Sequence, residues 1–211
     1  GLVVLVVATV LIFVQPEWMW GTLALVWVGL LISLTGGYLG DRYVGPQAHH
    51  RRVPESLKGF GDSYTLLVYV TSAPFVLVEP GGVTVITVKS QGGEVTYEDG
   101  GWHHNQKLGL LRRFAGQESL GRPHRLAEAE AEVIEDVLDK NVPDDVEIPV
   151  RSVLLFTDPD VVLYAEDAPM PALRAAELKR WLRKNPLEPS LSDDVRTRIA
   201  KALGYEEEMQ S

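Results

Sequence analysis

The chain has 211 residues, with 20 Lys and Arg against 29 Asp and Glu, and a formal net charge of −9 at pH 7. It contains no Cys, which excludes a disulfide, a thiolate nucleophile and a Cys-ligated zinc site. Residues 1–40 carry one formal charge, Glu17, and the other charged side chains follow in residues 41–211. This distribution predicts an apolar N-terminal part joined to a charged globular part, and it excludes a fibrous or wholly disordered protein.

Two apolar runs, residues 1–14 and 21–40, are separated by a short polar break. The second run is long enough to form a helix of about 30 Å, which matches the core of a bilayer. Pro16 and Glu17 interrupt the helical pattern, and Trp18 and Trp20 suit the headgroup boundary. We therefore expect residues 1–40 to form a transmembrane helical hairpin, with the lipid bilayer and other membrane proteins as its partners.

Two alternatives to the hairpin are a cleaved signal peptide, which leaves the second run unexplained, and a helical hairpin buried in the domain. Arg42, Arg51 and Arg52 follow the second run, whereas the break between the runs holds no Lys or Arg. The positive-inside rule then predicts a multi-pass protein of the cell (inner) membrane with its C-terminal domain in the cytoplasm. The chain begins at Gly1 rather than at a Met, so we expect residues upstream of it.

We expect a juxtamembrane linker at residues 41–60, a cytoplasmic domain at 61–204 and an acidic tail at 205–211. Strands are predicted at 64–70, 75–78, 83–88, 94–98 and 150–157, where β-branched and aromatic residues are frequent. The Pro80-Gly81-Gly82 turn predicts a hairpin in which Val78 lies opposite Val83, so that the numbers of paired residues sum to 161.

Helical spacing appears in the second half of the domain. A shared apolar face predicts a helix at 125–140; its members are Leu126, Ala129, Val133, Val137 and Leu138. Pro171 is expected in the first turn of a second helix that continues through Leu173 and Leu182. Ser192 is expected to cap a last helix that Gly204 closes. The fold class predicted is α/β, with a mixed sheet flanked by helices.

Residues 75–95, from Phe-Val-Leu-Val through Val-Thr-Val-Ile-Thr-Val-Lys to Gly-Gly-Glu-Val, followed by Gly101-Trp102, resemble the nuclease-related domain (NERD) family. Weaker similarity extends over residues 50–204. The resemblance implies a restriction-endonuclease-like fold. In that fold, an Asp on one strand and a Glu two residues before a Lys on the next strand hold a divalent metal, and the Lys helps to position the attacking water.

The resemblance also implies which positions carry the motif. Lys89 matches the Lys, Thr87 stands in place of the Glu, and Pro74, which the hairpin register puts opposite Thr87, stands about where the Asp is expected. Glu79, at the turn, is seven residues from Ser72, which the register puts opposite Lys89, or on the order of 23 Å along the strand, and Glu94 offers a single carboxylate. We therefore expect a vestigial site with no catalytic residue, no metal and no cofactor.

Residues 41–125 hold ten basic and eight acidic residues, whereas residues 126–211 hold ten basic and twenty acidic residues. One stretch is locally positive and could bind a phosphate or a lipid headgroup, the alternative being a solvated face; it comprises Lys107, Arg112, Arg113, Arg122 and Arg125. The acidic balance argues against nucleic acid as a partner. The His residues occur as adjacent pairs or singly, which does not favour a zinc site.

The function predicted from these observations is a membrane-anchored, non-catalytic NERD-like protein that serves as an interaction or accessory subunit of a membrane protein complex. No small-molecule substrate is evident. Two alternatives stay open at this point: a membrane-tethered metal-dependent nuclease, and a module that binds nucleic acid or anionic lipid without cleavage.

Overall fold

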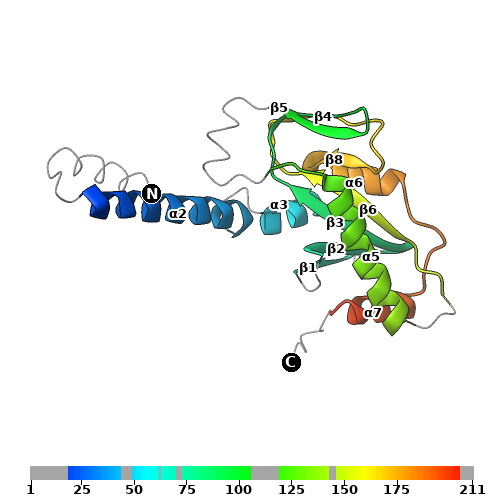
Figure 1. The fold of residues 1–211 in the computed structure, drawn as a ribbon. Helices are drawn as coiled ribbons and strands as arrows, with labels where there is room; N and C mark the ends of the chain where they lie inside the picture. Colours follow the sequence, from blue (N-terminus) through cyan, green and yellow to red (C-terminus); the bar gives the residue numbers. More distant parts are fainter. Residues whose placement is uncertain are drawn as a thin grey trace. The chain divides into compact units, whose positions relative to one another are not determined.

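The computed structural model describes residues 19–43, 49–61, 63–69, 73–105, 119–142 and 146–204 (Figure 1). The chain divides into two compact units. One comprises residues 1–48 and 107–119, and the other comprises residues 49–106 and 120–211. The first predicted membrane run and the predicted acidic tail lie outside the described residues.

Helix α2, Met19–Tyr43, contains the second apolar run and extends over 25 residues. Several of its large apolar side chains are exposed, among them Trp20 at 77%, Trp27 at 60% and Leu31 at 61%. Within the described ranges, no helix has both the length and the hydropathy that a membrane crossing requires.

The larger unit is a mixed α/β domain, as predicted. Its elements in chain order are α3 (His49–Ser56), β1 (Thr65–Val68), β2 (Phe75–Glu79), β3 (Gly82–Lys89), β4 (Gly93–Glu98), β5 (Gly101–Asn105), α5 (Pro123–Asn141), β6 (Val150–Phe156), β7 (Val161–Tyr164), β8 (Ala172–Arg174), α6 (Ala175–Lys184) and α7 (Asp193–Ala202). The described strands form a five-stranded sheet in the order β1-β2-β3-β6-β8 and a three-stranded sheet in the order β5-β4-β7.

The central hairpin has the predicted register, because Val78 pairs with Val83 and Val76 with Val85. Gly82 permits the turn: its φ is 153°, and a Cβ at this position would lie 2.3 Å from the carbonyl oxygen of Pro149. On its other side β3 runs parallel to β6, with Lys89 opposite Phe156 at the carboxyl ends of the two strands.

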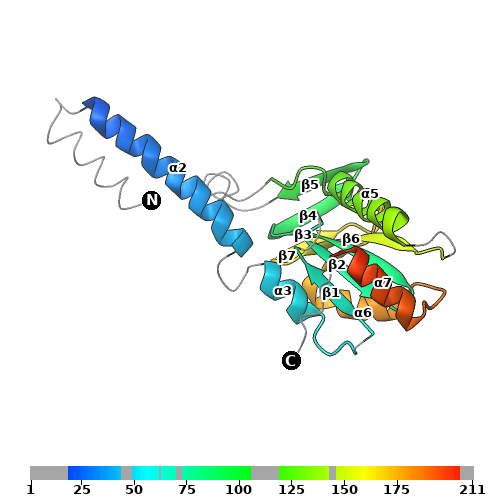
Figure 2. The ribbon, with the colours of Figure 1, turned by 90° about the horizontal axis from the view of Figure 1, so that it is seen from below.

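Alternate residues of the strands pack against different helices, so that the large sheet is a middle layer (Figure 2). Val76, Val78, Val83 and Val85 pack in one cluster with residues of α5 and α7. Phe75, Leu77 and Ile86 pack in another with residues of α3 and α6. Helix α3 lies in the predicted linker, yet its Val53 is fully buried in the second cluster.

The predicted apolar face of α5 is confirmed at Val137 and Leu138, which pack in the core, and is wrong in the first half of the helix. The helix buries Pro123, Ala127, Ile134 and Leu138, whereas Leu126 and Val133 are 44% and 42% exposed. The predicted face and the buried face both contain apolar residues at helical spacing. The sequence pattern alone therefore does not indicate which of the two faces packs against the sheet.

Residues 171–174 do not begin a helix, contrary to the prediction. Ala172–Arg174 form β8, in which Leu173 pairs with Leu155 of β6, and α6 begins at Ala175. Strands β5 and β7 were also not predicted. The last helix is confirmed: the Ser192 side chain accepts a hydrogen bond from the Val195 amide, and Gly204 follows the helix with a φ of 90°.

Candidate functional site

The carboxyl end of β3 carries the residues that the resemblance singles out. Thr87 is 1% exposed and Lys89 is 5% exposed. The two side chains share the sheet face that α5 covers, because side chains two apart on a strand point to the same face and Val83 and Val85 pack with residues of α5. The hairpin register, extended by two residues from Val76 and Val85, puts Pro74 opposite Thr87. The side chain of Lys89 is therefore buried, although the residue lies at the end of its strand.

Helix α5 brings a carboxylate to this end of β3. The Thr87 hydroxyl donates a hydrogen bond to Oε2 of Glu130 at 2.5 Å. Glu130 is half-buried and lies between Ala127 and Ile134 on the buried stripe of the helix. The sequence pattern did not indicate Glu130, because this residue lies outside the apolar face that the pattern predicted for the helix. The signal that could have found it is a Glu at the spacing of the buried residues.

A second carboxylate lies where β6 ends. The carbonyl oxygen of Lys89 accepts hydrogen bonds from the Thr157 amide at 2.9 Å and the Thr157 hydroxyl at 3.3 Å. The next residue, Asp158, lies against Gly92, where a Cβ would be 2.4 Å from the Asp158 carboxylate. Ligand sites in α/β proteins form at the carboxyl ends of parallel strands, which makes this edge the candidate functional site.

A catalytic metal does not fit the donors at this edge. A divalent cation of the kind that nucleases use takes several oxygen ligands. Position 87 offers a hydroxyl and position 74 a proline, and the carboxylates that the structure adds at this edge are Glu130, hydrogen bonded to Thr87, and Asp158, beyond the end of the neighbouring strand. Among the described residues, no three His, Asp or Glu side chains lie together as a metal site would require. We therefore derive no hydrolytic step through a metal.

Of the described histidines, His49 and His50 begin α3, and the other three belong to the small sheet and its surroundings. His103 and His104 are neighbours on β5, opposite Thr96 and Val95. The ring of His104 makes a hydrogen bond with the carbonyl oxygen of Gly92 at 2.8 Å, and His124 Nδ1 accepts one from the indole N–H of Trp102 at 3.0 Å. These contacts tie β5 to the end of β3 and to α5.

Two of the five predicted basic residues are described. Arg122 precedes α5 and Arg125 lies in its first turn, and both are exposed. Lys107, Arg112 and Arg113 lie outside the described residues. The structure therefore leaves the predicted basic phosphate or lipid site as a prediction.

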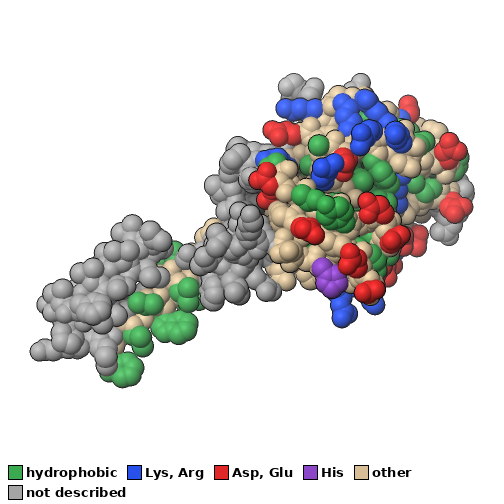
Figure 3. Space-filling model, turned by 90° about the horizontal axis from the view of Figure 1, so that it is seen from above, with side chains coloured by type: hydrophobic (Ala, Val, Ile, Leu, Met, Phe, Trp, Pro, Cys, Tyr) green, Lys and Arg blue, Asp and Glu red, His purple; other side chains and the backbone are tan. Residues whose placement is uncertain are grey.

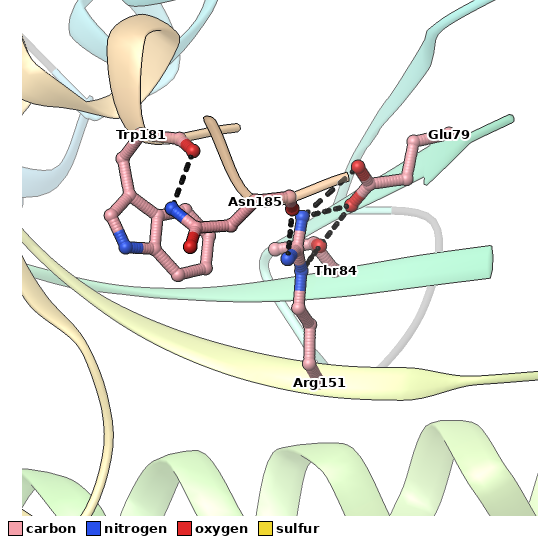
Figure 4. Close-up of polar contacts among 5 residues, drawn as sticks. All are labelled: Glu79, Thr84, Arg151, Trp181 and Asn185. Carbon is pink, nitrogen blue, oxygen red and sulfur yellow. Dashed lines mark hydrogen bonds and ion pairs between the residues drawn. The ribbon is translucent and has the colours of Figure 1, made fainter. Parts of the chain in front are cut away.

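A second polar cluster lies at the other end of β3 (Figure 4). Arg151, on β6, donates from Nη2 to both carboxylate oxygens of Glu79 at 3.0 Å and from Nε to the Thr84 hydroxyl at 2.8 Å. Its Nη1 donates to the carbonyl oxygen of Asn185 at 2.6 Å, and its guanidinium carbon lies 4.6 Å from the centre of the Trp181 ring.

Glu79 in this cluster is 1% exposed, so that its charge depends on its partners. The Thr84 hydroxyl also donates to the carboxylate. Burial raises the pKa of the nearby Tyr64, and the charge of Glu79 raises it further, while Arg183 and Arg151 oppose the rise. All three guanidinium nitrogens of Arg151 donate hydrogen bonds within the protein. The cluster therefore joins the end of α6 to the large sheet, and its charged groups bind one another rather than a substrate.

Comparison with known proteins adds no relative to these observations. No protein-family model, curated protein or solved structure matches the chain.

Proposed function

We propose that the protein is a membrane-anchored, nuclease-like module without catalytic activity that serves as an interaction or accessory subunit of a membrane protein complex. The observation that carries the proposal is the end of β3: Lys89 is buried there, and the position of the motif's Glu is Thr87, hydrogen bonded to Glu130. A hydroxyl and a proline in place of two carboxylates support the loss of metal-dependent hydrolysis.

The nuclease-like part of the proposal draws on the hairpin. Its register puts Pro74 opposite Thr87, the two positions where the NERD resemblance implies carboxylates, and Lys89 is the last residue of its second strand. The strand lies beside a parallel strand and under a helix, which is consistent with a sheet flanked by helices in the fold that the resemblance implies.

The membrane part of the proposal draws on the sequence. Residues 21–40 contain no Asp, Glu, Lys, Arg or His, and they lie within the continuous helix α2. The exposure of Trp20, Trp27 and Leu31 supports contact of this helix with lipid or with other membrane helices. Arg42, Arg51 and Arg52 after the run support a cytoplasmic position for the domain.

Membrane fractionation and native mass measurement test this proposal. We expect the full chain to resist extraction by alkaline carbonate, to dissolve in mild detergent and to be recovered in a complex of defined mass. A Leu23→Arg, Leu31→Arg variant should lose membrane retention, because two Arg side chains in a membrane span are unfavourable by roughly 5 kcal/mol or more. A soluble chain, or a lone monomer in every detergent, contradicts the proposal.

One observation favours a second function, a membrane-tethered metal-dependent nuclease. Glu130 delivers a carboxylate to the strand that carries Lys89, and Asp158 lies at the end of the neighbouring strand. This alternative predicts Mn²⁺-dependent nicking of DNA by the full chain in detergent, which Glu130→Gln would abolish. The matched control is Glu132→Gln, an exposed position on the same helix.

A further inference from the structure

The small sheet has one face that no described element covers. Residues of its other face, Val95 and Trp102 among them, pack in a cluster with Phe156. On the open face the register aligns two rows across the strands. Asn105, Glu94 and Val162 form one row, and His103, Thr96 and Tyr164 form the next.

The open face combines apolar and acidic side chains. Val162 is 46% exposed and Tyr164 is 51% exposed. Glu94 lies next to Val162, and Glu98 is four residues further along the same strand, on the same face; both are exposed. Figure 3 views the molecule from the side on which β4 and β5 lie in Figure 1, and it shows hydrophobic and acidic side chains next to one another, with Lys and Arg side chains around them.

The segments that build this sheet have a one-sided charge. Residues 90–106 and 157–171, which hold its three strands and the adjoining loops, contain seven acidic residues and no Lys or Arg. The seven are Glu94, Glu98, Asp99, Asp158, Asp160, Glu166 and Asp167. Helix α5 is also predominantly acidic, whereas on α6 and α7 Arg side chains pair with Glu or Asp. The small sheet is thus a local negative surface around an exposed Val and Tyr.

We infer that the open face of β5-β4-β7 binds a basic segment of a partner protein, in which apolar side chains alternate with Lys or Arg. The inference rests on the interaction role proposed above and names the chemistry of the partner. Lys or Arg would meet Glu94 and Glu98, and an apolar side chain would cover Val162 and Tyr164. DNA, anionic lipid and a second copy of this face all carry negative charge and are repelled.

Binding of a defined peptide tests the inference. The probe is a fluorescent decapeptide of alternating Lys and Val, titrated into the full chain in a neutral detergent, and the reference is the same peptide with Glu in place of Lys. We expect saturable binding of the Lys peptide, no binding of the Glu peptide, and weaker binding at about 1 M salt, where charges are screened beyond about 3 Å.

Three variants separate this face from the overall negative charge of the chain. Glu94→Gln with Glu98→Gln should weaken binding of the Lys peptide about three- to tenfold, since exposed ion pairs contribute modestly. Glu128→Gln with Glu132→Gln makes the same charge change on the exposed side of α5 and should leave binding within about twofold. Tyr164→Ser should weaken binding about threefold or more if the ring is covered in the complex.

A charge reversal keeps the test decisive whatever the effect of the neutral variants. Glu94→Lys with Glu98→Lys should lose the Lys peptide and bind the Glu peptide, while circular dichroism confirms the fold. Equal weakening by the α5 control, or preferential binding of DNA or anionic phosphatidylserine vesicles through this face, overturns the inference. Failure of the peptide to bind a chain that remains in a membrane complex rejects this face and leaves the proposed function standing. A lone, DNA-cleaving monomer rejects the proposed function.

Discussion

The two ends of β3 both bury charged groups, and they do so in different ways. At the turn end, Arg151 meets Glu79, Thr84 and Asn185 with all three of its nitrogens. At the carboxyl end, Lys89 lies buried beside a hydroxyl–carboxylate pair from Thr87 and Glu130. The comparison teaches that the cluster at the turn end joins the hairpin to β6 and α6, whereas the carboxyl end places a hydroxyl and a carboxylate where the proposed function expects the remnant of a nuclease site.

The largest effect is expected when the turn-end cluster is broken. Arg151→Ala should lower the free energy of unfolding by about 3–5 kcal/mol, because it leaves the carboxylate of Glu79 buried without its cation. Urea unfolding of the full chain in detergent measures the change. Arg180→Ala, at a side chain 72% exposed, should change stability by less than about 0.5 kcal/mol.

Replacing both Glu79 and Arg151 tests whether the unpaired charge causes the loss of stability. Glu79→Leu combined with Arg151→Met should recover much of the lost stability, because it removes both charges and keeps apolar volume. A double variant as unstable as Arg151→Ala would mean that packing, rather than the unpaired charge, explains the loss.

A substitution in the turn between β2 and β3 is expected to have a smaller effect on stability. A Cβ at Gly81 would lie 1.8 Å from the carbonyl oxygen of Leu187, which is backbone and cannot move aside easily. Gly81→Ala should therefore lower the free energy of unfolding by about 2–3 kcal/mol. Gly61→Ala is the control, since no atom lies within 4 Å of a Cβ there. Equal stability of the two variants in thermal unfolding would contradict the close packing of the turn.

Substitutions at the carboxyl end of β3 should change the free energy of unfolding less. Thr87→Val keeps the shape of the side chain and removes its hydrogen bond to Glu130, which should lower the free energy of unfolding by about 1 kcal/mol. Glu130→Gln and the double variant complete a double-mutant cycle. We expect a coupling energy of about 0.5–1.5 kcal/mol. Strictly additive effects would show that the Thr87–Glu130 contact does not contribute to stability.

The smallest effect concerns the start of α6. The side-chain hydrogen bond from Arg174 lowers the pKa of Glu177. A lowered pKa in the folded state gives a stabilisation that is present above about pH 4.5, the ordinary value, and is lost as the pH falls below it. Glu177→Gln should be less stable than the wild type by less than about 1 kcal/mol at pH 7. The difference should vanish near pH 2 in urea unfolding; a constant difference would contradict the assignment.

The sequence predicted features that depend on neighbours in the chain. The register of Val78 with Val83 follows from the Pro-Gly-Gly turn, and the cap at Ser192 follows from a local hydrogen bond. It did not predict β8, because the pairing of Leu173 with Leu155 is a contact between distant residues. The burial of Lys89 and the approach of Glu130 likewise depend on which face of α5 meets the sheet.

One measurement tests the central claim most directly: nicking of supercoiled plasmid DNA by the full chain in detergent with Mg²⁺ or Mn²⁺, side by side with Lys89→Ala. The account predicts the same background level for the two proteins with either metal, because position 87 is a Thr and position 74 a Pro. Metal-dependent nicking by the wild type that Lys89→Ala abolishes would contradict it and would identify the end of β3 as an active nuclease site.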